Sequence, residues 1–116
     1  MRAYFPSDIT VEDKATVTAL LETFNEKALK SSPHFKGVSF GWGIENDFPV
    51  PGEEGKTASM VVAFAGWDSL EGHIEFSQSP AFSENIGLFG GMPGLIKVVN
   101  VHVRCEATEA PTTGEV

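Results

Sequence analysis

Residues 61–76 read VVAFAGWDSLEGHIEF, and this stretch decides the fold. Its first residues are apolar, as in a buried strand, and a tight Gly-Trp corner follows them. A helix is predicted to open at Asp68, whose carboxylate can accept hydrogen bonds from the first turn, while Glu71 stands at the capping-box position. A further strand is predicted at residues 95–104. Strand, helix and strand in close succession are typical of a small α+β domain.

The clearest helix lies nearer the start of the chain. Thr10 is its predicted N-cap, and Asp13 stands at the capping-box position. The helix is predicted to run to about Lys30 and to end before Pro33, because the residue preceding a proline disfavours the helical region. Its apolar residues recur at helical spacing: Ala15, Val17, Leu20, Leu21, Phe24 and Ala28.

Two strands are predicted in the middle of the chain. Residues 38–44 alternate large apolar side chains with small ones, and residues 57–65 are mostly apolar. Residues 45–56 between them are rich in proline and glycine and are expected to form a long loop. A short first strand at residues 1–5, and a second short helix beginning at Ser79, complete the order β-α-β-β-α-β. The sequence therefore predicts a ferredoxin-like antiparallel sheet.

Length and charge limit the classes of protein to consider. A chain of 116 residues predicts one domain over residues 1–105, followed by a disordered acidic tail at residues 106–116. The net charge of −8 argues against nucleic acid and anionic membranes as partners. No apolar run is long enough to cross a bilayer, and no apolar leader is visible. With Cys105 as the one cysteine, a reducing, cytoplasmic location is expected.

One part of the decisive stretch carries a family resemblance. Residues 65–76 match the pattern W-[DE]-S-x-E-x-H, and Ser79-Pro80 fits the second short helix that usually follows it. In these residues the chain resembles the dimeric α+β barrel superfamily, in its antibiotic-biosynthesis-monooxygenase and stress-responsive branches. The resemblance implies a homodimer whose two sheets close into a barrel around a lumen that binds small molecules. The predicted first strand is shorter than in that pattern, and the chain could be half of a tandem protein.

Two histidines are the first candidates for chemistry. His102 shares a predicted strand face with Asn100, and a lumen histidine near its reference pKa of about 6.5 could act as general acid or base. Asn100 could polarise a carbonyl group. His73 lies on the predicted helix after the corner and could reach the entrance of the lumen. Alternatively, His102 is solvated at the end of the sheet, and His73 anchors its helix through a backbone carbonyl.

Several other residues are candidates for binding a substrate. Aromatic and sulfur-containing side chains on the two central strands could line an apolar pocket, or could equally belong to the core. His34 in a turn and the phenol of Tyr4 are further candidates. No cofactor and no metal are expected, because no nucleotide-binding or metal-binding spacing is present. The predicted lining residues are Trp42, Phe40, Met60 and Phe64.

Three functions are compatible with this pattern. The first is a cofactor-independent enzyme that cyclises, dehydrates or rearranges a hydrophobic aromatic or polyketide-like substrate through histidine acid–base catalysis. The second is a cofactor-free monooxygenase, in which the same base deprotonates a phenol and the substrate anion reacts with oxygen. The third is a stress-responsive or ligand-binding dimer without catalytic activity. Both enzymes need a base and an apolar cavity, so the sequence does not separate them.

Overall fold

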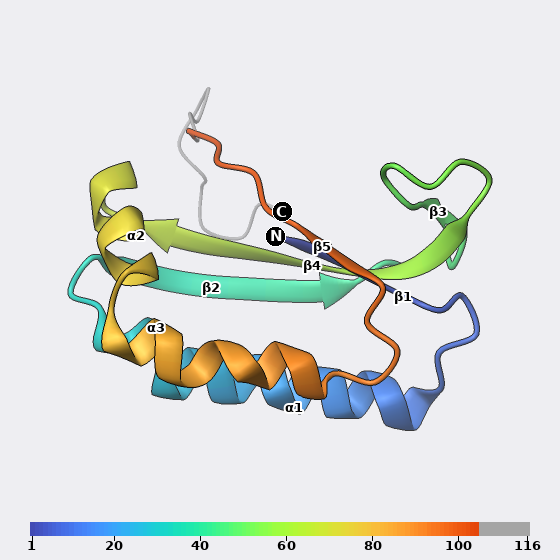
Figure 1. Cartoon of the computed structure of the whole chain (residues 1–116), viewed down its shortest axis with the longest axis horizontal. Coiled ribbons are helices and arrows are strands. Elements are labelled where there is room, and N and C mark those ends of the chain that lie inside the picture. Colours follow the sequence, from blue (N-terminus) through green and yellow to red (C-terminus); the bar gives the residue numbers. More distant parts are fainter. Residues whose placement is uncertain (105–116) are drawn as a thin grey trace, which may run out of the picture.

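The computed structural model describes residues 1–104, and its fold is a mixed α+β arrangement with an antiparallel sheet (Figure 1). The sheet has the spatial order β2-β4-β1-β5, and the short β3 pairs with β4. The predicted α+β class is confirmed, and the arrangement is compatible with a ferredoxin-like fold. The tail predicted at residues 106–116 lies outside the described residues. The strands are β1 (Arg2–Phe5), β2 (Phe35–Trp42), β3 (Phe48–Pro49), β4 (Thr57–Trp67) and β5 (Lys97–Val99).

Helices cover one face of this sheet. In Figure 1 the long α1 and the shorter α3 lie beneath the strands, and α2 lies at the end of β4. Two 3₁₀ segments, η1 and η2, follow α1 and α3 respectively. The helical segments are α1 (Val11–Lys27), η1 (Leu29–Ser31), α2 (Leu70–Ser77), α3 (Pro80–Asn85) and η2 (Ile86–Gly91).

Hydroxyl side chains cap all three α-helices. Thr10 accepts a hydrogen bond from the backbone N–H of Asp13 at 3.1 Å, as predicted. Ser79 caps α3, also as predicted. The N-cap of α2 is Ser69, which accepts from the N–H of Gly72, and the prediction that Asp68 would cap this helix is wrong. Asp68 precedes the helix, and its carboxylate forms hydrogen bonds with the side chains of His34 and Ser69.

The core lies between the helices and one face of the sheet. Strand register places Phe40 opposite Ala63 and Trp42 opposite Val61, so both aromatic side chains lie on the covered face. Both side chains are partly buried there and contribute apolar contacts to the core. Phe40 and Trp42 therefore do not share a sheet face with Phe64. The buried centre of this core consists of Ala3, Phe5, Val17, Leu21, Val61 and Met92.

Among residues 1–104, the opposite face of the sheet, which we call the open face, is packed beneath other side chains at one end. There Tyr4 packs with Val50 and Ala58 beneath the loop that carries β3. This loop is a hairpin, because β3 pairs with the start of β4. Farther along β4, the described residues leave Phe64 66% exposed on this face.

The last strand is shorter than predicted, and its faces are reversed. β5 spans only Lys97–Val99, and residues 100–104 have no regular secondary structure. Its pairing with β1 runs from Lys97 opposite Tyr4 to Val99 opposite Arg2. Val98, which by strand alternation shares the face predicted for Asn100 and His102 to point into the lumen, packs into the covered core instead. Beyond β5 the chain rises from the sheet on the side opposite α1 (Figure 1).

Candidate functional site

The structure brings the two predicted catalytic histidines together. His102 Nε2 lies 2.9 Å from His73 Nδ1, so one imidazole donates an N–H to the other. His73 is held by α2, and His102 belongs to the segment that leaves the sheet after β5. The ring of His73 also stacks on Trp67, with centroids 4.8 Å apart and planes inclined by 13°. The strand-to-helix corner therefore orients one member of the pair.

The surroundings of His73 favour its neutral form. Partial burial lowers the pKa of His73 below its ordinary value of 6.5, and the positive charge that His102 can carry lowers it further. Near neutral pH the pair therefore contains at least one neutral imidazole. A neutral imidazole with a second imidazole at hydrogen-bond distance can accept a proton and share the resulting charge.

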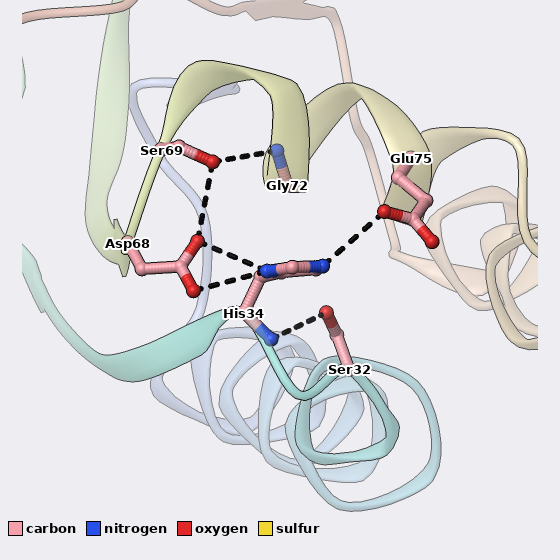
Figure 2. Close-up of polar contacts among 6 residues, drawn as sticks. All are labelled: Ser32, His34, Asp68, Ser69, Gly72 and Glu75. Atoms are coloured by element: carbon pink, nitrogen blue, oxygen red, sulfur yellow. Dashed lines mark hydrogen bonds and ion pairs between the residues drawn. The ribbon is translucent and has the colours of Figure 1, made fainter.

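A second cluster forms around His34, at the entrance to β2 (Figure 2). The Nδ1 atom of His34 lies 3.1 and 3.0 Å from the two carboxylate oxygens of Asp68. Its Nε2 atom lies 3.2 Å from Glu75 Oε2 on α2. The hydrogen bond to Asp68 is the main cause that raises the pKa of His34, and the same bond lowers the pKa of Asp68.

This cluster joins β2, β4 and α2. The backbone N–H of Asp68 donates to the carbonyl of His34 at 2.9 Å, which extends the pairing of the two strands. The imidazole lies directly against Gly72, where an added Cβ would stand 2.6 Å from His34 Cβ and Cγ. Both ring nitrogens of His34 face carboxylates, so neither is available as a base. The predicted substrate-binding role of His34 stays a prediction, while its contacts are those of an anchor.

The sequence reasoning missed this cluster. The local pattern predicts that Asp68 caps the first turn of the helix, whereas its side-chain partner His34 is 34 residues away. The signal that could have found it is the pairing of the β2 and β4 ends. Once Phe35 is aligned opposite Trp67, the preceding His34 and the following Asp68 are neighbours.

The predicted substrate-binding residues divide between the two faces. Tyr4 and Met60 pair with each other and lie on the open face near the hairpin loop. Phe64 lies on the same face, opposite Ser39. Because β2 is an edge strand, Phe40 and Trp42 still reach a shallow depression of about 310 Å³ that Phe64 also lines. Asn100 lies in the exposed segment between β5 and His102.

Trp42 has polar partners on α1 as well. Its indole N–H donates to Thr18 Oγ1 at 3.4 Å, and Lys14 Nζ lies 5.3 Å from the ring centroid. These contacts fix the ring at the edge of the sheet, and a cation over an aromatic face is favourable. Trp42 therefore closes the core at this edge as well as lining the depression.

A larger depression of about 610 Å³ lies on the hairpin loop, lined by residues of the range 49–57. None of its lining residues is a histidine, so it is separate from the histidine pair. Among residues 1–104, no group of three or more histidine, cysteine, aspartate or glutamate side chains is arranged to hold a metal ion. Within the same residues, no helix has both the length and the apolar character needed to cross a membrane.

Comparison with known proteins does not identify a family. No protein-family model, no curated protein and no solved structure that was compared with the chain matches it. The arrangement of an antiparallel sheet with helices on one face is shared by proteins of many functions. Function must therefore be argued from the site.

Proposed function

We propose that the protein is a cofactor-independent enzyme that acts on a hydrophobic, aromatic or polyketide-like small molecule. The pair formed by His73 and His102 is its acid–base group, and the open face binds the substrate. The observation that carries this proposal is the 2.9 Å contact between the two imidazoles, together with the lowered pKa of His73. Two histidines from distant parts of the chain, next to an exposed apolar sheet face, form a minimal acid–base site.

The proposed acid–base chemistry follows from the contact between His73 and His102. A neutral imidazole removes a proton from a carbon next to a carbonyl group, and the resulting imidazolium returns it to another position. Proton transfers of this kind cyclise, dehydrate or rearrange an enolisable substrate. The same base acting on an electron-rich phenol would yield an anion that reacts directly with oxygen, which is the monooxygenase form of this proposal.

A homodimer would complete the site. The open face carries Phe64, and the segment after β5 adds Val101 and Val103, which are 60% and 73% exposed. Large exposed apolar surfaces of this kind mark interaction sites. Two open faces packed against each other would form the dimeric α+β barrel expected from the resemblance, with a ferredoxin-like unit in each chain and the substrate between them.

The proposal is tested by proton exchange on a model ketone. In D₂O, the protein is expected to catalyse α-proton exchange of 2-tetralone, followed by NMR, with a rate that falls as the pH drops through the lowered pKa of His73. His102→Gln and His73→Gln should each reduce this rate by about 10²-fold or more, the usual range for a general acid–base group. Lys27→Gln is the control, because Lys27 is an exposed residue at the end of α1 and lies outside the pair.

Two results would overturn the proposal. Equal exchange rates in the wild type and both pair variants would remove the histidines from catalysis. Binding of 2-tetralone without any exchange would instead indicate a ligand-binding dimer. A native mass spectrum of the freshly purified protein, recorded first, shows whether two chains retain a small molecule.

A further inference from the structure

The open face differs in charge from the rest of the protein. The chain has 16 acidic and 8 basic residues and a net charge of −8. Among the strand residues that the structure describes, the open face carries no carboxylate. Three basic side chains, those of Arg2, Lys36 and Lys97, lie there instead. An acidic protein thus presents a basic, largely apolar sheet face on the side toward which the segment that carries His102 leaves β5 (Figure 1).

Arg2 lies in the middle of this surface. It pairs with Val62 of β4 on one side and with Val99 of β5 on the other, so apolar side chains flank it. Phe64 follows Val62 on the same face. Within residues 1–104, Arg2 belongs to none of the ion pairs. A guanidinium in this position can bind a carboxylate through two parallel hydrogen bonds.

Lys36 lies at the end of the face nearest α2. An added Cβ on Gly66 would stand 3.5 Å from Lys36 Cβ, which places the lysine stem beside β4 on the open face. Lys36 is close enough to Asp68 to lower its pKa, but the hydrogen bonds of that carboxylate go to His34 and Ser69. Lys97, at the opposite end, donates to the carbonyl of Pro51 at 2.6 Å and holds the hairpin loop. Arg2 and Lys36 are therefore the cations available to a ligand.

We infer that the substrate is a small organic anion, an apolar skeleton that carries a carboxylate. This inference rests on the proposed function and specifies its substrate class. The valine and phenylalanine side chains would bind the skeleton, and Arg2, assisted by Lys36, would bind the carboxylate. Binding of the charged end would then fix which carbon lies next to the histidine pair.

The proposed dimer strengthens this inference. If two open faces pack together, the cations of both copies face the same interface, and like charges in a partly dry space repel each other. A bound anion offsets this repulsion, whereas a second copy alone does not. The open face is therefore better suited to an anionic ligand held between two copies than to an empty apolar contact.

The test compares two probes of nearly equal shape. Naphthalene-2-carboxylate and the neutral naphthalene-2-carboxamide are titrated into the full-length protein at pH 7.5 and followed by calorimetry. The carboxylate is expected to bind roughly tenfold more tightly, and this preference should shrink as salt is added. Arg2→Gln should abolish most of the preference, and Arg2→Lys should retain part of it. Lys27→Gln, on α1 and away from the open face, should leave it unchanged.

The outcomes separate the two proposals. Equal binding of both probes, or a preference that survives in the Arg2→Gln and Lys36→Gln variants, would overturn the anion inference. Histidine-dependent exchange of 2-tetralone would still support the enzyme in that case. Binding of neither probe would overturn the apolar binding face on which the substrate class depends. Lys36 is exposed, so its substitution reports on binding even if the Arg2 variants fold poorly.

Discussion

Gly72 is the residue that lets His34 lie against α2. An added Cβ would stand 2.6 Å from two carbon atoms of His34 and 2.8 Å from Asp68 Oδ1. Gly72→Ala should therefore lower the free energy of unfolding by about 1–3 kcal/mol, the usual cost of overpacking. Urea unfolding followed by tryptophan fluorescence measures this change.

Gly87 provides the matched control. An added Cβ there meets nothing within 4 Å, so Gly87→Ala should be neutral or slightly stabilising. If the Gly72 and Gly87 variants lost equal stability, the loss would not come from the His34 contact. An unchanged stability of Gly72→Ala would show that His34 does not pack against the helix.

The contacts of His34 predict how the stability of the fold depends on pH. Its pKa is raised above 6.5, mainly by the hydrogen bond to Asp68. The stabilisation is therefore fully present below about pH 6.5 and is lost as the pH rises through the folded-state pKa. His73 has the opposite sign, because its pKa is lowered, and its contribution is lost as the pH falls below 6.5.

The His34 contribution can be isolated by difference. Urea midpoints of the wild type and of His34→Gln are compared between pH 5.5 and 8.5, where the His73 contribution is common to both proteins. At the acidic end the wild type should have a higher urea midpoint than the variant. The difference between the two midpoints should shrink as the pH rises. A difference that grows with pH would contradict the ion cluster.

The stability of α2 depends on its N-cap residue. Ser69 accepts from the N–H of Gly72 at 3.0 Å, and this N–H would otherwise lack an intrahelical partner. Ser69→Ala should lower the free energy of unfolding by about 1 kcal/mol. Ser69→Asp retains a capping oxygen and should lower the free energy of unfolding much less. Equal losses in the two variants would exclude capping as the cause.

Local rules predicted most elements because their causes are local. The hydroxyl caps of α1 and α3 lie within three residues of their partners, and the alternation along β2 follows from strand geometry. The end of β5 was not predictable in this way. Its apolar pattern continues to Val103, but its pairing with β1 stops at Val99, and the length of a strand depends on a partner from another part of the chain.

The open face predicts that two copies of the protein associate through it. Phe64→Asp would place a charge in the proposed interface, and burial of an unpaired charge is costly. We expect the wild type to be a dimer by light scattering and the variant to be a monomer with native circular dichroism. Glu71→Asp, on exposed α2, is a control that should remain dimeric. A monomeric wild type would contradict the barrel.

The assembly of the sites is the part that sequence patterns could not supply. His73 and His102 were each candidates, yet nothing in their spacing showed that their rings would meet. The contact depends on residues 100–104 leaving the sheet, which in turn depends on the short pairing of β5. In the same way, the cations of the open face become one surface only when β1 lies between β4 and β5.

The position of β1 also determines the order in which the molecule can form. β1 emerges first during synthesis, yet it occupies the interior of the sheet, and its partners lie near residue 60 and at residues 97–99. β2 and β4 are closer in the sequence, with residues 43–56 between them. Closing the longer loop between β1 and β4 costs more chain entropy and slows its formation. We therefore expect the β2–β4 pair to form first and β1 to join the sheet after it.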